Sequence, residues 1–231
     1  CEMLTDRTKE YVAELLLGQI TDTQDITGTV LEEREVAVSE AQVREVIAGF
    51  VGGYDQIPPM YSALKVNGKK LYELARAGKE VERQARHVDL PAIEILEIKF
   101  PVVKFRVECS KGTYIRTLCH DIGEKLGCGG CMAALRRTMA AGFTEAQAVT
   151  LEQVQAQGTS LLLPTDSLFR DSPALTLPAG TAEKRVRCGN PITLPGTPDG
   201  TYRVYSQEGQ FLCLSRASGG TLTSIKNFFG A

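Results

Sequence analysis

The sequence predicts an α+β protein with a mixed central sheet flanked by helices over residues 1–170 and a small β-rich domain over residues 171–231. In the first range, stretches of alternating apolar and polar residues interchange with stretches of helical spacing. After residue 170 the chain becomes rich in Pro, Gly, Ser and Thr and keeps only short apolar pieces, among them 202–205 and 211–214. Short strands separated by turns are typical of a β-barrel-like domain.

The first predicted elements are a strand and a helix. The stretch KEYVAELLL at 9–17 begins with period-2 alternation and ends apolar, which predicts a strand. The helix begins at Ser39, because Ser39-x-x-Gln42 is a capping box and the apolar residues that follow share one helical face. A Gly-Gly pair at 52–53 ends this helix, and the Pro-Pro pair at 58–59 forces an extended segment.

Helices and strands continue to alternate in the rest of the first range. Residues 70–77 predict a short helix, and the alternating apolar positions of 88–109 predict two strands. Thr113 is a suitable helix cap, and the apolar residues of 115–126 that follow it have helical spacing. A further helix is expected over Leu151–Gln157.

The composition is that of an ordinary soluble globular protein, with 43% hydrophobic and 23% charged residues among 231. No apolar run approaches the roughly 20 residues that a membrane-spanning helix needs, and the polar start, CEMLTDRTKE, does not resemble a secretory signal. The seven cysteines are an odd, scattered set, which favours reduced thiols and a cytoplasmic location. Because the first residue is Cys, we expect the natural start to lie upstream.

One cysteine pair has the spacing of a metal site. Cys128-Gly-Gly-Cys131 is the only C-x-x-C in the sequence, and a structural zinc site usually needs a second pair of ligands. Only Cys119 and His120 lie close by in the sequence. We therefore expect no bound metal.

Charge is divided unevenly along the chain. Residues 1–55 hold 4 Lys/Arg and 12 Asp/Glu, a net of −8, whereas residues 56–231 hold 22 and 16, a net of +6. Residues 65–87 contain seven cations and three carboxylates, a net of +4. Such a stretch can bind a phosphate backbone, although composition alone favours a solvated helix face with i,i+4 ion pairs.

The sequence lacks the common catalytic templates. Its two histidines, His87 and His120, form no H-E-x-x-H motif, and no nucleophile elbow, Walker loop or dinucleotide-binding glycine motif is present. Asp22 and Asp25 in TDTQD are candidate carboxylates, but Asp and Thr crowded in a loop more often satisfy turn backbone.

Three segments combine residue types that suit RNA. IPPMYSALK at 57–65 places an aromatic and a basic residue after a loop that two prolines stiffen. SKGTYIR at 110–116 places Tyr114 and Arg116 at a helix start, where backbone N–H groups favour anions. Leu135 precedes two arginines. A ring, a cation and an apolar wall suit a pocket for a planar base beside a phosphate backbone, although each segment alone also fits core packing or surface charge.

Together these segments resemble the TruB family, bacterial synthases that convert the T-loop uridine at tRNA position 55 to pseudouridine. The resemblance covers nearly all of residues 9–170, in the family's order and spacing. It lies in KEYVAELLLGQITDTQDITG at 9–28, QIPPMYSALKVNGKKLYELARAGKEVER at 56–83, CSKGTYIRTLCHDIGEKLG at 109–127 and AALRRT at 133–138. The tail resembles the family's small PUA-like RNA-binding domain in LPAG at 177–180, RCGNPI at 187–192 and GQFLCL at 209–214.

The resemblance implies roles for single residues. Tyr11 matches the tyrosine that stacks on the flipped base and is implicated in proton transfer, and Tyr114 matches a contact to the target nucleotide. Arg116 matches the arginine that pairs with the catalytic aspartate, and Leu135 matches an apolar contact to the target uridine. The cations expected to bind the RNA are Lys65, Lys69, Lys70, Arg136 and Arg137. The family's mechanism needs no cofactor, and no obligate protein partner is expected.

The sequence departs from the family near its start. The family's nucleophilic aspartate lies in a G-H-T-G-T-L-D-P motif upstream of the K-E-Y strand, and only ten residues precede Tyr11 here. We therefore expect the segment that carries this aspartate to be missing from the amino-terminal end. Asp6, Asp22 and Asp25 occupy other positions and are not expected to replace it.

The function predicted for the intact protein is isomerisation of uridine to pseudouridine in the T-stem-loop of tRNA. Two alternatives stay open. A tRNA-binding or tRNA-folding factor without chemistry would keep the basic surface and the β domain. A guide-RNA-dependent synthase would share the pocket residues but would need partner proteins. A purely structural domain would require the ordered motifs to be coincidental.

Overall fold

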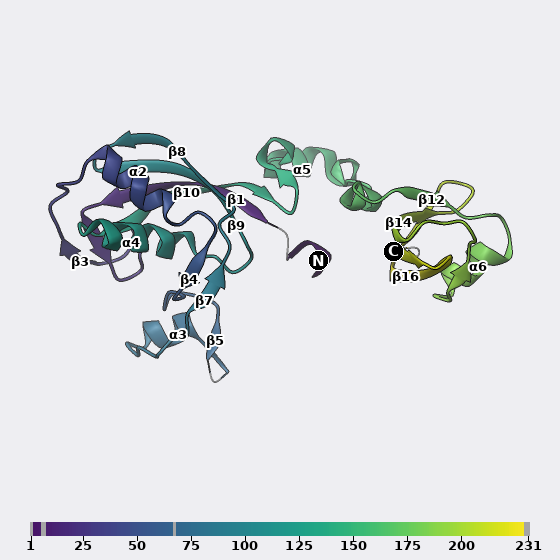
Figure 1. The fold of residues 1–231 in the computed structure, drawn as a ribbon, viewed down its shortest axis with the longest axis horizontal. Helices are drawn as coiled ribbons and strands as arrows, with labels where there is room; N and C mark the ends of the chain where they lie inside the picture. The colour runs from purple at the N-terminus through teal and green to yellow at the C-terminus, as the bar shows by residue number, and fades with distance from the viewer. Residues whose placement is uncertain (1, 6–7, 67, 229–231) are drawn as a thin grey trace. The chain divides into compact units, whose positions relative to one another are not determined.

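The computed structural model describes residues 2–5, 8–66 and 68–228. Contacts between residues divide the chain into two compact units, 1–148 and 149–231, and each unit is considered by itself (Figure 1). Asp6 lies outside the described residues. The first unit opens with a short helix, α1 (Glu2–Thr5).

The first unit is built on a five-stranded sheet. Its order is β11 (Phe143–Thr144), β10 (Gly130–Ala140), β1 (Lys9–Leu17), β9 (Val102–Cys109) and β8 (Ala92–Lys99). Every neighbouring pair in this order is antiparallel. β9 and β10 still run in the same direction, because each pairs antiparallel with β1, which lies between them. This differs from the expected mixed sheet, since the two parallel strands are not neighbours.

Alternation along the strands places the core on one face of this sheet. Ala13 and Leu15 of β1 and Phe105 of β9 are fully buried. The residues between them point to the other face, where Glu10 and Arg106 form an ion pair at 2.6 Å. An antiparallel sheet with one packed face and one polar face accounts for the period-2 pattern of its strands. The strand predicted over 9–17 is confirmed.

Two helices, α2 (Glu40–Ala48) and α4 (Ile115–Leu126), pack against the sheet and against each other. The predicted capping box of α2 is confirmed. The Gln42 N–H donates to Ser39 Oγ at 3.3 Å, and the Ser39 N–H donates to Gln42 Oε1 at 2.9 Å.

The helix α4 forms the crossover between β9 and β10 and carries two of the predicted site residues at its start. Its N-cap is Tyr114 and not the predicted Thr113, because the Thr113 hydroxyl donates to Ser110 O at 3.0 Å instead. The helix ends at Gly127, whose left-handed φ of 79° is a conformation that glycine adopts without strain.

Small elements extend from the main sheet. They are β2 (Gln19–Thr21), β3 (Val30–Glu33), β4 (Tyr54–Gln56), β5 (Lys65–Val66), β6 (Lys69–Lys70), α3 (Leu71–Arg76) and β7 (Arg86–Val88). The pairs β2–β3, β4–β7 and β5–β6 are each antiparallel. Figure 1 shows the β5–β6 hairpin and α3 reaching away from the central sheet, beyond β4 and β7. The short helix predicted over 70–77 corresponds to α3.

The end of the first unit and the second unit contain the remaining elements. They are η1 (Glu145–Gln147), α5 (Leu151–Gln157), η2 (Gly158–Leu161), η3 (Thr165–Phe169), β12 (Ala174–Thr176), α6 (Thr181–Arg187), β13 (Ile192–Thr193), β14 (Gly200–Tyr205), β15 (Phe211–Ser218) and β16 (Thr221–Asn227). The strands form one sheet in the order β12-β14-β15-β16-β13, in which β12 and β14 are parallel. The helix predicted over 151–157 is confirmed as α5.

The second unit has its own apolar core, which includes Leu177, Val204 and Leu212. The Phe169 ring of η3 lies 6.2 Å from the Phe211 ring, so part of the segment before residue 170 packs with the C-terminal sheet. This packing agrees with the place of η3 in the second unit. The domain boundary expected at 170/171 stays a prediction.

Candidate active site

The core of the candidate site is an ion pair between Arg116 and Asp25. Arg116 lies in the first turn of α4, and its Nη1 is 2.9 Å from Asp25 Oδ2. Its Nη2 donates to the backbone carbonyl of Tyr61 at 2.9 Å. The side chains of Arg116 and Asp25 are 25% and 15% exposed, so the pair is partly shielded from water but still accessible. A guanidinium with five N–H donors can bind further acceptors from this position.

The Asp25 carboxylate accepts several hydrogen bonds besides that from Arg116. Its Oδ1 accepts from the Thr27 N–H at 3.0 Å, from the Thr27 hydroxyl and from the Thr23 hydroxyl at 3.1 Å. Burial raises the pKa of Asp25, but the hydrogen bonds from Thr27, Arg116 and Thr23 outweigh it and lower the pKa below its usual value. Asp25 is therefore ionised at neutral pH.

The loop that carries Asp25 is tied to β10 and α4. The Ile26 N–H donates to Met132 O at 2.9 Å, and the Met132 N–H donates to Gln24 O at 3.0 Å. The Thr117 hydroxyl of α4 donates to Gln24 Oε1 at 2.7 Å. Gln24 has a φ of 63°, a left-handed conformation that is uncommon for a residue with a side chain. These contacts fix the carboxylate in front of Arg116.

Tyr114 is held by the side chain of Gln56, which is 2% exposed. The Tyr114 N–H donates to Gln56 Oε1 at 2.8 Å, and Gln56 Nε2 donates to Tyr114 O at 3.1 Å. Gln56 Nε2 also donates to the Tyr54 hydroxyl at 2.6 Å, which donates to Asp121 Oδ2 at 2.7 Å. Burial, followed by the charge of Asp121, raises the pKa of Tyr54, which therefore stays a neutral hydrogen-bond donor.

Tyr11 lies on β1 directly opposite Arg137 of β10. The Arg137 guanidinium lies over the Tyr11 ring, 5.5 Å from its centroid. Burial is the main cause that raises the pKa of Tyr11. The ring packs against the apolar core of the first unit, which also includes Ile115, the neighbour of Arg116. The structure thus joins Tyr11 to Arg137 directly, and joins Arg116 to Asp25 and Tyr61.

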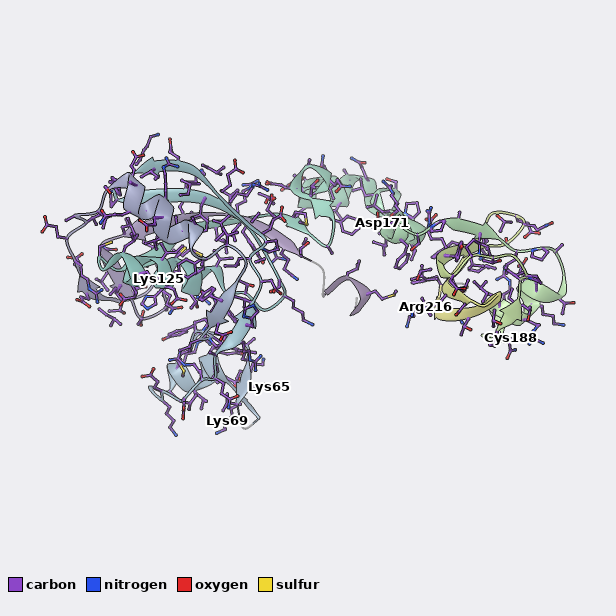
Figure 2. All side chains as sticks on the ribbon, in the orientation of Figure 1. Lys65, Lys69, Lys125, Asp171, Cys188 and Arg216 are labelled. Carbon is purple, nitrogen blue, oxygen red and sulfur yellow. The ribbon has the colours of Figure 1, made fainter. Side chains whose placement is uncertain are left out.

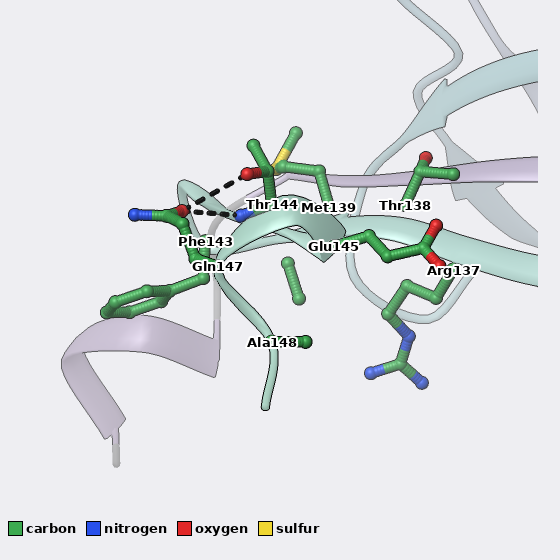
Figure 3. Close-up of a pocket in the computed structure, with 9 residues that line it drawn as sticks. Arg137, Thr138, Met139, Phe143, Thr144, Glu145, Gln147 and Ala148 are labelled. Atoms are coloured by element: carbon green, nitrogen blue, oxygen red, sulfur yellow. Dashed lines mark hydrogen bonds between the residues drawn. The ribbon is translucent and has the colours of Figure 1, made fainter. Parts of the chain in front are cut away.

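Three residues predicted to contact the RNA lie on β10, namely Leu135, Arg136 and Arg137. Leu135 is 43% exposed, so its apolar side chain is accessible. The Arg136 guanidinium forms an ion pair with Glu145. Arg137 lines a pocket of about 240 Å³ with Met139, Phe143 and six other residues, shown in Figure 3. This pocket is too open and too one-sided to enclose a base by itself, because its described walls come from β10, β11 and the residues after them.

The predicted RNA-binding lysines lie on the β5–β6 hairpin. Lys65 and Lys70 are paired across it, and Figure 2 labels Lys65 and Lys69 at this projecting part of the first unit. Lys65 and Lys69 are exposed. Lys70 donates to the Tyr72 hydroxyl at 3.2 Å. These lysines belong to a different element from the strands that carry Tyr11 and Leu135.

Neither a metal centre nor a membrane span emerges from the described part of the chain. Among residues 2–5, 8–66 and 68–228, no group of three or more His, Cys, Asp or Glu side chains is arranged to hold a metal ion. None of the described helices is long and apolar enough to cross a membrane.

Comparison with known families matches two adjacent parts of the chain. Residues 1–115 match the model of the TruB family pseudouridylate synthase N-terminal domain. Residues 116–170 match that of the tRNA pseudouridylate synthase B C-terminal domain. The chain belongs to the TruB family of pseudouridylate synthases. The resemblance inferred from the four sequence stretches is confirmed.

Three curated relatives illustrate the match. The tRNA pseudouridine synthase B of Alkaliphilus oremlandii is 54% identical over 71% of this chain, but the match spans only 56% of that relative. The enzyme of the same name from Pseudomonas fluorescens is 44% identical over 94% of this chain and 74% of the relative. That from Clostridium acetobutylicum is 42% identical over 94% of this chain and 77% of the relative.

Solved structures share the fold of the TruB-family chain at lower identity. One is an H/ACA ribonucleoprotein bound to a substrate RNA containing 2′-deoxyuridine, with a TM-score of 0.66 and 22% identity. Another is a Cbf5–Nop10–Gar1 complex, with a TM-score of 0.66 and 23% identity. Each match covers 99% of this chain and 68% of the solved chain. These structures establish the fold alone.

Sequence reasoning overlooked two residues of this site. The sequence predicts that Asp25 stabilises a turn, and its Oδ1 does accept from the Thr27 N–H there, but its Oδ2 pairs with Arg116. The Thr-rich TDTQD stretch was a usable signal, because several donors around one aspartate favour its ionised form. For Gln56 the sequence contains no pattern that indicates a functional role, apart from its position at the start of the QIPP stretch.

Proposed function

We propose that this TruB-family chain takes part in converting uridine to pseudouridine at position 55 in the T-loop of tRNA. The observation that carries the proposal is the ion-paired Arg116 at the start of α4, with Asp25 on one side and the Tyr61 carbonyl on the other. Relatives that are 42–54% identical to it over the matched residues are named tRNA pseudouridine synthase B. The proposal covers the intact protein, since these relatives extend beyond the match.

Arg116 is proposed to hold the nucleophilic aspartate that the family uses. The pair with Asp25 fixes one edge of the guanidinium, and its remaining N–H donors can hold a second carboxylate ionised and in place. The aspartate either attacks the ribose or triggers glycal formation, so that the C1′–N1 bond breaks. The uracil rotates and rejoins through C5, and a base removes the C5 proton. No cofactor is needed for these steps.

The other site residues are proposed to enclose the base. The half-buried Tyr11 ring offers a stacking surface, Leu135 offers an exposed apolar contact, and Tyr114 contacts the target nucleotide. A flat and dry pocket compensates for the loss of stacking when a base is flipped out. It also retains the detached uracil, whose escape would leave an abasic site.

The proposed partner is the T-stem-loop of tRNA, with no obligate protein partner and a cytoplasmic location. The cations on the β5–β6 hairpin and on β10 would neutralise phosphates. They are Lys65, Lys69, Lys70, Arg136 and Arg137. The C-terminal five-stranded sheet is proposed to be a PUA-type RNA-binding domain, extending the contact beyond the loop.

Two alternatives remain testable. A tRNA-binding or folding factor would keep the basic hairpin without turnover. A guide-RNA-dependent synthase is suggested by the fold shared with the H/ACA ribonucleoprotein, and it would require partner proteins. Activity of the intact protein on bare tRNA would count against both alternatives.

The test is tritium release from a tRNA transcript labelled at uridine C5. The 231-residue chain is assayed alone and again after the upstream segment of a full-length protein is added back. We expect tRNA binding without release from the chain alone, and release once the segment is restored. Release by the chain alone would mean that a carboxylate within it is the nucleophile, and no release in either case would contradict the proposed activity.

A further inference from the structure

The Gln56 side chain binds the backbone of Tyr114 through both of its polar atoms. The two hydrogen bonds, at 2.8 and 3.1 Å, reproduce the exchange between two residues of an antiparallel ladder, although one partner here is a side chain. The amide is almost completely buried, with 2% of the residue exposed. A glutamine so enclosed has few alternative partners, so the arrangement defines one orientation of the Tyr114 peptide units.

The orientation of Tyr114 matters because it is the N-cap of α4. Its φ and ψ of −103° and 108° are extended, and its side chain makes no capping hydrogen bond. The Tyr114 carbonyl begins the helix by accepting from the Leu118 N–H at 3.0 Å. Gln56 Nε2 donates to the same carbonyl. Gln56 therefore fixes the point from which the first turn, including Arg116, extends.

The segment that follows Gln56 contacts the same helical turn a second time. Five residues later the Tyr61 carbonyl accepts from Arg116 Nη2 at 2.9 Å. The prolines at 58–59 limit the conformations of the chain between these contacts. The start of α4 is thus held at the Tyr114 backbone and at the Arg116 guanidinium by one stiff segment. The β5–β6 hairpin with its lysines begins four residues after Tyr61.

We propose that Gln56 is a positioning residue that sets the direction of Arg116 and links it to the basic β5–β6 hairpin. The inference rests on the proposed function and adds a residue to its site. Gln56 is placed to act through Tyr114 and not on the uridine itself. Loss of its amide should leave the cations of the hairpin in place while Arg116 loses its fixed geometry, so chemistry should suffer more than tRNA binding.

The neighbouring Tyr54 provides a matched control. Its hydroxyl accepts from Gln56 and donates to Asp121, which lies seven residues after Tyr114 on the same helix. Tyr54→Phe removes the bond to Asp121 and the bond that Gln56 Nε2 donates to the Tyr54 hydroxyl, but it leaves both bonds between Gln56 and Tyr114. If Gln56 only stabilised the fold, Tyr54→Phe should have a similar effect. If Gln56 orients Arg116, Tyr54→Phe should not share that effect.

The first experiment measures single-turnover tritium release, tRNA affinity and Tm in the full-length protein. Gln56→Met, which keeps the length and removes the two hydrogen bonds with Tyr114 together with the one to Tyr54, should slow release by about tenfold or more, as expected for the loss of roughly 1.4 kcal/mol or more of transition-state stabilisation. Its Kd for tRNA should change by less than about threefold, and Tyr54→Phe should keep a nearly normal rate. A normal rate in Gln56→Met, or an equal loss in Tyr54→Phe, would overturn the proposal.

A second variant distinguishes positioning from a folding defect. In Gln56→Glu, a protonated carboxyl can still accept from the Tyr114 N–H and donate to the Tyr114 carbonyl, whereas a carboxylate would repel that carbonyl. Its release rate relative to the unsubstituted protein should therefore rise as the pH is lowered. A constant ratio across the pH range would contradict the assignment.

A readout without turnover keeps this inference separate from the proposed function. The ¹⁵N resonance of Arg116 Nε should shift or broaden in Gln56→Met and stay unchanged in Tyr54→Phe. If the unsubstituted full-length protein releases no tritium, the proposed function fails, and the resonance alone decides the positioning role. An unchanged resonance in Gln56→Met would refute that role whatever the activity.

Discussion

The Arg116 guanidinium and the Asp25 carboxylate lie 2.9 Å apart although 91 residues separate them in the sequence. The pair joins the first turn of α4 to the loop between β2 and β3. Because Asp25 is also held by Thr23 and Thr27, it is a fixed partner and not a passing surface contact. Five predictions concern this pair and the elements around it.

Replacing Arg116 with Met should reduce turnover far more than tRNA binding. The substitution keeps the apolar stem but removes the cation that partners the carboxylates. Loss of one preorganised electrostatic partner costs about 100-fold or more in rate. The measurements are single-turnover tritium release and filter binding with the full-length protein. Equal losses in rate and in affinity would show that Arg116 serves RNA binding in general.

Replacing Asp25 with Asn should loosen Arg116 without changing the shape of the site. The neutral amide can still accept from the Thr27 N–H, but the guanidinium keeps only the Tyr61 carbonyl. Leaving a partly buried cation without its charged partner should cost about 1–3 kcal/mol of unfolding free energy. Urea denaturation at pH 7 measures this loss, and Asp22→Asn, in the same loop, is the control.

The Asp25 pair also predicts a dependence of stability on pH. The pKa of Asp25 is lower in the folded protein than its ordinary value of 3.8. Its contribution is therefore fully present above that value and is lost as the pH falls through the folded pKa. The difference in unfolding free energy between the unsubstituted protein and Asp25→Asn should shrink as the pH falls from about 4, the ordinary carboxyl pKa, to about 2, and should stay level above that range. A difference that stays constant would mean that the charge of Asp25 contributes nothing.

The basic hairpin should determine the salt dependence of tRNA binding. Lys65→Ala combined with Lys69→Ala removes two exposed cations from β5 and β6. Each lost phosphate contact should reduce the slope of log K against log salt by roughly 0.7–0.9. Turnover at saturating tRNA should stay close to normal. Lys99→Ala, on β8, is the control, because that lysine is paired with Glu97 and lies on another element.

Gly123 within α4 and Gly127 at its C-cap should differ in their tolerance of alanine. A Cβ at Gly123 would lie 2.3 Å from the Gly129 carbonyl carbon and 2.3 Å from the Gly130 nitrogen, so backbone would have to move. Gly127→Ala meets no atom within 4 Å and is disfavoured only by its left-handed φ. We expect losses of about 3 kcal/mol or more for Gly123→Ala and about 1–2 kcal/mol for Gly127→Ala. Urea denaturation measures both, and the reverse order would contradict the close packing of α4 on β10.

Local patterns in the sequence predicted the parts of the fold that depend on neighbouring residues. The alternation over 9–17 became β1, and the Ser39 capping box formed as expected, because both patterns follow from backbone geometry alone. The cap of α4 was displaced by one residue, because the Thr113 hydroxyl bonds Ser110 instead. Contacts divide the chain after residue 148, the composition changes near residue 170, and the domain boundary expected at 170/171 stays a prediction.

The sequence predicted those site residues that the family resemblance named. It did not predict residues whose role comes from a contact with a residue far away in the sequence. Arg116 and Tyr114 were expected at a helix start, and both are found there. Asp25 and Gln56 reach α4 across 91 and 58 residues, and no period or spacing reports such a contact. Their residue types also have common local uses in turns and on surfaces, which a single sequence cannot separate from a role in a site.

The place of β1 between β9 and β10 has a consequence for synthesis of the chain on the ribosome. Leu17 completes β1 long before Ala140 completes the strand that pairs with it. At a translation rate of roughly 5–20 residues per second, the two edges of this apolar strand stay unpaired for on the order of ten seconds. During that time the VAELLL stretch is an open template for other strands. The nascent protein should therefore depend on chaperone shielding or on fast collapse of the first helices until the last strand of the sheet emerges.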